Sequence, residues 1–132
     1  MIQHIKHLLG RRNLLILAVF YTCAITLLFF IPGSDLPNIN FSAADKIVHC
    51  LLYFILINLW LIYFYTKMDF QLDAKWIQVL LLTILLYGII IEILQGQFTA
   101  SRSADIFDVC ANLIGSLLGI FFFKRIKNSF KT

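Results

Sequence analysis

The chain has 132 residues, of which 61% are hydrophobic and only 14% are charged, and its mean hydropathy is +0.88. This composition excludes an ordinary soluble domain, in which about a quarter of the residues are charged. The high hydropathy therefore predicts a membrane protein. The net charge of +4 is not accompanied by a recognisable nucleic-acid-binding module, so we predict no nucleic-acid partner.

Four long apolar runs account for this composition. Each contains about 18 to 20 residues, and at roughly 1.5 Å per residue such a helix crosses a hydrocarbon core about 30 Å thick. We therefore predict an all-α fold, a four-helix transmembrane bundle that forms a single domain over residues 1–132. The predicted helices cover residues 14–31, 47–65, 76–95 and 106–123.

The first run follows a basic start that contains Lys6, Arg11 and Arg12. A cleaved signal peptide begins in the same way, but its apolar part is usually shorter. In addition, the segment PGSDLPN after the run lacks a clear small-residue cleavage site. We therefore predict that the first run is a membrane-spanning helix.

The start of the second run carries a polar stripe. Asp45, His49 and Tyr53 are spaced i, i+4, i+8, so they share one side of a helix, and Lys46 follows Asp45. Ser42 and Asp45 also form a Ser-x-x-Asp pattern, in which Ser42 would cap the helix. Capping does not explain His49, which lies inside the apolar run.

The third run ends in polar residues. Glu92 and Gln95 are spaced i, i+3 and share a face of the predicted helix close to its end. Arg102 follows in the loop before the fourth run.

The fourth run begins with a further polar stripe. Asp105, Asp108 and Asn112 are spaced i, i+3, i+7, and the two acids also suit a capping role. The same helix continues with Gly115 and Gly119, a G-x-x-x-G pattern that allows a neighbouring backbone to approach closely. We interpret the glycines as packing inside the bundle, and a homo-oligomer through this face is not favoured.

Positive charge is distributed unevenly between the two ends of the predicted helices. Lys46 and Arg102 fall on one side, and all other lysines and arginines fall on the opposite side. Because positively charged loops stay in the cytoplasm, we predict that both termini are cytoplasmic and that the loops 32–46 and 96–105 face outward. The residues on the cytoplasmic side are Lys6, Arg11, Arg12, Lys67, Lys75, Lys124, Arg125, Lys127 and Lys131.

This orientation places the polar stripes of three helices at the same depth, near the outer surface. Ionised groups directed at lipid would cost several kcal/mol each, so we predict that the stripes face one another and form a polar chamber. Two interpretations remain open. In the structural one, the groups only tie helices together, with Glu92 or Asp108 paired to Arg102. In the functional one, Lys46 and Arg102 bind an anionic, membrane-borne ligand.

The functional interpretation assigns roles to ten residues. His49 would carry a proton, with a carboxylate orienting its ring. A metal site formed by His49, Glu92, Asp105 and Asp108 is chemically possible, but no two of these ligands show a dedicated metal-ligand spacing, so we predict no metal and no other cofactor. The candidate catalytic residues are His49, Glu92 and Asp108, and the candidate ligand-binding residues are Asp45, Lys46, Tyr53, Gln95, Arg102, Asp105 and Asn112.

Three segments resemble the signature of the VanZ-like family of small bacterial membrane proteins. They are DKIVHCLLYF (45–54), EILQ (92–95) and SRSADIFDVCANLIGSLLG (101–119). The resemblance covers about residues 30–123, and it departs from the family in the segment GQFTAS, where a shorter turn with Pro-Gly is common. The matching positions are Asp45, Lys46, His49, Tyr53, Glu92, Gln95, Arg102, Asp108, Asn112 and Gly115.

The resemblance implies a multi-pass protein of the bacterial inner membrane that acts in the cell envelope. The founding member of the family is associated with low-level resistance to the glycopeptide teicoplanin, but the family supplies no settled reaction. We therefore expect either an enzyme acting on an anionic, lipid-linked envelope component or a non-catalytic accessory protein with the same pocket. A transporter is a weaker third interpretation, because four helices without an inverted repeat make a small pathway.

Overall fold

A computed structural model of the chain describes residues 10–31, 42–99 and 104–130. In these segments the protein is all-α, as predicted, and each of its four long helices is long and apolar enough to cross a membrane. They are α2 (Arg11–Phe29), α3 (Ser42–Lys67), α4 (Ala74–Phe98) and α5 (Ile106–Ile126), and a short 3-10 helix, η2 (Lys127–Phe130), follows α5.

Most helix ends lie beyond the apolar runs that predict them, although α2 ends at Phe29, two residues before the predicted end, and α5 begins at the predicted residue 106. The largest difference is at the start of α3, which begins at Ser42, whereas the second run begins at residue 47. The apolar run marks only the part of a helix that lies in lipid. The backbone hydrogen bonds continue into the polar residues, because a helix satisfies its own donors and acceptors wherever the membrane ends. Asp45 and Lys46 are therefore helical residues rather than loop residues.

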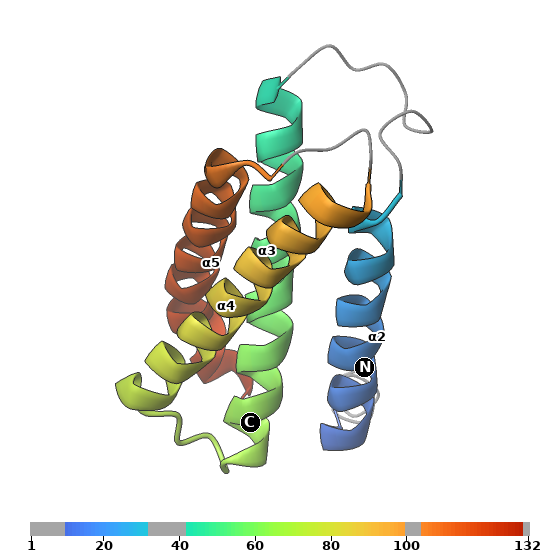
Figure 1. The fold of residues 1–132 in the computed structure, drawn as a ribbon. Helices are drawn as coiled ribbons and strands as arrows, with labels where there is room; N and C mark the ends of the chain where they lie inside the picture. The colour runs from blue at the N-terminus through green and yellow to red at the C-terminus, as the bar shows by residue number, and fades with distance from the viewer. Residues whose placement is uncertain (1–9, 32–41, 100–103, 131–132) are drawn as a thin grey trace.

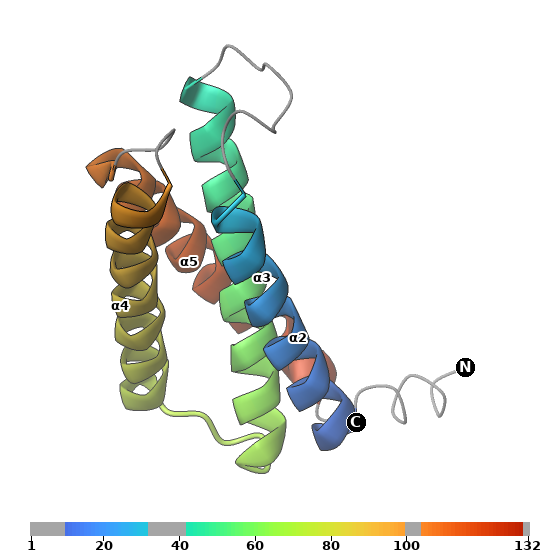
Figure 2. The same cartoon turned by 45° about the vertical axis from the view of Figure 1, so that its right-hand side comes forward.

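The four helices run alternately up and down, with α3 at the centre. Helix α3 packs against α5 on one side and α2 on the other, while α4 crosses the bundle at an angle (Figures 1 and 2). The starts of α3 and α5 and the end of α4 lie at one end of the bundle, at the top of Figure 1, which we call the upper end. The most deeply buried large apolar side chains are Tyr53, Leu56, Ile57, Leu61, Tyr65 and Phe123.

Two glycines of α5 set the close contact between α5 and α3. A Cβ atom on Gly115 would overlap the backbone of Cys50, and one on Gly119 would overlap the side chains of Ile57 and Asn58. The G-x-x-x-G face therefore packs inside the chain, as predicted, and lets the two helix backbones approach one another.

Polar side chains attach α2 to its neighbours. The Tyr21 hydroxyl donates to the carbonyl of Leu52 at 2.8 Å, and the Thr26 and Tyr87 hydroxyls lie 2.7 Å apart. Between these two contacts along α2, the indole N–H of Trp60 donates to Thr22 at 3.1 Å. Such hydrogen bonds supply specificity in a membrane, where burial of apolar surface cannot drive helices together.

Apolar side chains cover the outside of the bundle. Large hydrophobic residues on the surfaces of all four helices are exposed, among them Phe20, Leu27, Leu82 and Phe107. In water this surface would be unfavourable, whereas lipid chains solvate it well. The chain is accordingly a multi-pass membrane protein.

Candidate functional site

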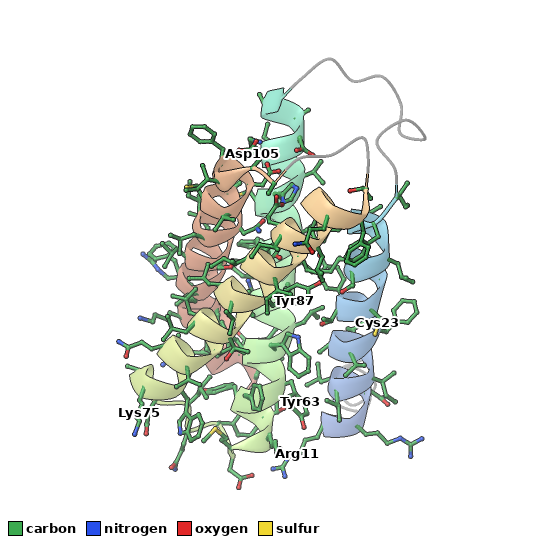
Figure 3. The ribbon with its side chains drawn as sticks, in the orientation of Figure 1. Arg11, Cys23, Tyr63, Lys75, Tyr87 and Asp105 are labelled. Atoms are coloured by element: carbon green, nitrogen blue, oxygen red, sulfur yellow. The ribbon has the colours of Figure 1, made fainter. Side chains whose placement is uncertain are left out.

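The polar side chains of α3, α4 and α5 meet at the upper end of the bundle. Figure 3 shows Asp105 at this end and Lys75 and Arg11 at the opposite end. We call the residues that gather there the polar cluster, which consists of Asp45, Lys46, His49, Glu92, Asp105, Asp108 and Asn112.

His49 is the buried centre of the polar cluster, with 2% of its surface exposed. Its Nδ1 lies 3.0 Å from Oδ1 of Asn112 on α5. Because an amide oxygen only accepts hydrogen bonds, Nδ1 carries the proton and Nε2 points the other way. Nε2 lies 3.9 Å from a carboxylate oxygen of Asp45 and 3.8 Å from one of Asp108. The ring of Phe29, at the end of α2, stacks on the imidazole at 5.0 Å between centroids.

Lys46 joins the two acids at the start of α5. Its ammonium donates to the carboxylates of both Asp105 and Asp108. Asp105 is the N-cap of α5, and its other oxygen accepts from the Phe107 amide at 2.8 Å. The hydrogen bond from Lys46, and then that from Phe107, hold the pKa of Asp105 below its usual value.

Glu92 is a buried acid on α4 with 4% of its surface exposed. One carboxylate oxygen accepts from the Asp105 backbone amide at 3.2 Å, while the other has no hydrogen-bond partner in the described part of the chain. Leaving a buried carboxylate oxygen unpaired is costly, because its water has been removed and nothing replaces it. Within the described part of the chain, Glu92 therefore keeps one hydrogen-bonding position open.

Beneath His49, the cluster is closed by Tyr53, Asn112 and a glycine of α4. Tyr53 is fully buried, and its hydroxyl has no partner among the described residues. A Cβ atom on Gly88 would lie 3.0 Å from both this hydroxyl and Nδ2 of Asn112. Gly88 thus leaves the space into which the two polar side chains project.

Gln95 does not bond to the polar cluster, although it was predicted as a ligand-binding residue. Its amide donates to the backbone carbonyl of Phe29 at 2.6 Å. This bond satisfies one of the free carbonyls at the end of α2. Because the Phe29 ring stacks on His49, Gln95 holds in place the residue that covers the polar cluster.

The structure brings together most of the residues that the sequence singles out, from three helices that are far apart in the chain. It pairs Asp108 with Lys46, whereas the sequence interpretation paired an acid with Arg102. Arg102 lies outside the described residues, as does the side chain of Ser42, the predicted cap of α3. The predicted residues in the polar cluster or directly beneath it are Asp45, Lys46, His49, Tyr53, Glu92, Asp105, Asp108 and Asn112.

Phe29 and Gly88 border the cluster, and sequence reasoning missed both. Phe29 is one apolar residue in an apolar run, so nothing in the sequence distinguishes it. Gly88 did carry a signal, because it is an isolated glycine in the middle of a long apolar helix and glycine is unfavourable there.

A separate apolar groove lies between α2, α3 and α4, and its volume is about 540 Å³. It runs along α4 from Trp76 to Tyr87, below the polar cluster, with Lys67 at its lower end. The Tyr87 ring at its upper end lies 6.2 Å from that of Tyr53. This groove is lined mainly by apolar side chains, and it ends beside the floor of the cluster.

Comparison with known families gives one match. The family model described as VanZ/LLP1 matches residues 12–127, which includes the whole polar cluster and all four long helices except Arg11, the first residue of α2. No curated protein and no solved structure matches the chain.

Proposed function

The chain belongs to the VanZ-like family, and from this premise we propose that its polar cluster binds the headgroup of an anionic, lipid-linked component of the bacterial cell envelope. The observation that carries the proposal is the burial of His49, Glu92, Asp108 and Asn112 at one end of a bundle whose outside is apolar. Ionisable groups inside a membrane are expensive, and they usually mark a binding site or a pathway.

The chemistry of the cluster supports an anionic headgroup that also exchanges protons. Lys46 supplies an ammonium at the surface of the cluster, and Arg102, which matches the family pattern, would supply a guanidinium suited to phosphate. His49, Glu92 and Asp108 are the candidate acids and bases beside the bound group. If the protein catalyses no reaction, the same site would let it act as an accessory protein that only binds the anionic envelope component.

The groove between α2, α3 and α4 supports the lipid-linked part of the proposal. From Trp76 to Tyr87 it follows α4 for about 16 Å, at roughly 1.5 Å per residue. An acyl or prenyl chain in the groove would end near Tyr53, directly beneath the polar cluster. Binding of such an envelope component by an inner-membrane protein would also account for a link to glycopeptide resistance of the kind that the family resemblance implies.

The proposal requires the polar cluster to face outward. A cysteine introduced at Asn128, beyond α5, is therefore expected to react with a membrane-impermeant maleimide only after the cells are permeabilised, because positive charge keeps this end in the cytoplasm. A cysteine introduced at Ala104 should react in intact cells. Labelling in the reverse order would contradict the orientation. The variants should be built in a background without the native cysteines, two of which are exposed.

Lipid retention tests the proposed function directly. Detergent-purified protein is offered phosphatidylglycerol, a polyprenyl phosphate or phosphatidylcholine, and bound lipid is counted by native mass spectrometry. We expect both anionic lipids to be retained in preference to phosphatidylcholine. Thr83→Trp should reduce retention severalfold, because Thr83 lines the groove and the indole would fill it.

Leu86→Trp is the matched control, since Leu86 lies on the same helix and is exposed to lipid outside the groove. Equal retention of charged and zwitterionic lipids would refute the proposed anionic ligand. Equal effects of the two tryptophans would refute the role of the groove.

A further inference from the structure

We propose that Asp45, His49 and Asp108 bind a divalent cation, which provides the positive charge that an anionic headgroup needs. This inference rests on the proposed function, and it names the recognition chemistry at the same site. It also revises the prediction that no metal is used, which followed from ligand spacing along the chain.

The three ligand atoms already surround a common point. Nε2 of His49, a carboxylate oxygen of Asp45 and one of Asp108 all lie within 4.8 Å of one another. Zinc holds nitrogen and oxygen ligands at about 2.0 to 2.2 Å, which places neighbouring ligands about 3.3 Å apart in a tetrahedron. Separations of 3.8 and 3.9 Å from Nε2 to the two oxygens therefore need only small side-chain rotations.

His49 is oriented as a metal ligand would be. The bond from Nδ1 to Oδ1 of Asn112 fixes the tautomer and leaves the lone pair of the neutral ring on Nε2, facing the carboxylates. If Nε2 carried a proton held by either acid, the distance to oxygen would be near 2.9 Å. The observed distances are about an ångström longer, so the nitrogen makes no hydrogen bond to these acids.

The charge balance of the described residues also favours a cation. The described part of the polar cluster holds the carboxyl groups of Asp45, Glu92, Asp105 and Asp108 but only one ammonium, that of Lys46, which contacts Asp105 and Asp108. A divalent ion would offset negative charge that Lys46 does not balance. One carboxylate oxygen of Glu92, a buried residue of the same polar cluster, has no hydrogen-bond partner among the described residues, which is an independent sign of a missing electrophilic partner.

The donor set restricts the kind of ion. One imidazole and two carboxylates suit Zn²⁺ or Mn²⁺, while Mg²⁺ prefers oxygen ligands and retains its water. Three protein ligands leave at least one coordination position for an oxygen of the headgroup. The cation would then orient a phosphate and draw electron density from it, while Asn112 holds His49 in place.

Titration with the cation alone tests the inference. Full-length protein is stripped with EDTA, and binding of Mn²⁺ and Zn²⁺ is followed by calorimetry and, for Mn²⁺, by electron paramagnetic resonance. We expect one ion per chain, and at least about a tenfold weaker Kd for Asp45→Asn, in which a neutral amide replaces a charged ligand. Asp45 is half-exposed, so this variant should fold. Asp73→Asn, at the exposed start of α4, is the matched control and should bind normally.

Absence of saturable binding, or an unchanged Kd in Asp45→Asn, would overturn the inference. The lipid assay repeated in EDTA separates it from the proposed function, and we expect retention of phosphatidylglycerol to fall. Full retention in EDTA without cation binding would reject the cation and leave the proposed function standing. Cation binding without any preference for anionic lipid would reject the proposed function and leave the cation site standing.

Discussion

Replacement of Gly115 by alanine is expected to destabilise the bundle by more than 2 to 3 kcal/mol, roughly the upper end of the usual cost of overpacking. The added Cβ would overlap the carbonyl group and Cα of Cys50, which are backbone atoms of α3 and cannot rotate away. Helices α3 and α5 would have to separate, and the contacts along their whole interface would weaken. The decrease can be measured as the thermal midpoint in detergent and as the free energy of unfolding in SDS.

The sign of the effect makes the prediction specific, because glycine to alanine in an open helix position is stabilising by about 1 kcal/mol. Gly119→Ala should cost less than Gly115→Ala, since the nearest atoms there belong to the side chains of Ile57 and Asn58. Leu117→Ala, on the lipid-facing side of the same helix, serves as the control. A Gly115→Ala protein of native stability but altered oligomeric state would place this face between chains and contradict the packing described here.

The sequence alone predicts the helices because lipid imposes a simple rule. A segment in the membrane must be apolar and must satisfy its own backbone, so four apolar runs could only be four helices. The rule fails at the start of α3, where Asp45 and Lys46 continue the helix outside the hydrocarbon core. Hydropathy contains no information about where a helix ends in water.

The polar cluster was predicted in part, for a reason that follows from helix geometry. Spacing fixes which residues of one helix share a face, so the stripe of Asp45, His49 and Tyr53 could be found from the sequence. Partners across helices depend on how the helices are rotated and how far they slide, which spacing does not encode. The pairing of Lys46 with Asp105 and Asp108 and the bond from Gln95 to Phe29 therefore emerged only from the fold.

The same limit explains the cation site. Metal-binding motifs are recognisable in a sequence when two ligands lie a few residues apart on one element. Asp45 and His49 are one helical turn apart, but a carboxylate and a histidine at that spacing are common, and Asp108 comes from another helix. The three become a candidate site only because Gly115 allows α5 to pack closely on α3.

Replacement of Lys46 by methionine is expected to lower the free energy of unfolding by about 1 to 3 kcal/mol. This decrease is smaller than the cost of breaking a fully buried ion pair, because Lys46 is partly exposed. Methionine keeps most of the apolar stem and removes the ammonium. Asp108, whose side chain is only 10% exposed, would then lose its cationic partner. The additional substitution Asp108→Asn should recover much of the loss, since it removes the uncompensated charge, and a double-mutant cycle on the free energy of unfolding measures the coupling.

Lipid retention distinguishes the two roles open to Lys46. It is measured in the four proteins of the cycle, namely the wild type, Lys46→Met, Asp108→Asn and the double variant. If the ammonium only neutralises the acids, the double variant should regain its stability and retain as much phosphatidylglycerol as Asp108→Asn alone. If it helps to bind the headgroup, as we propose, the double variant should be stable and retain less phosphatidylglycerol than Asp108→Asn alone. Additivity of the two substitutions within about 0.5 kcal/mol would show that Lys46 and Asp108 are not coupled. The ion pair between Lys46 and Asp108 would then be an incidental surface contact, and Asp108 would need another partner to explain its burial.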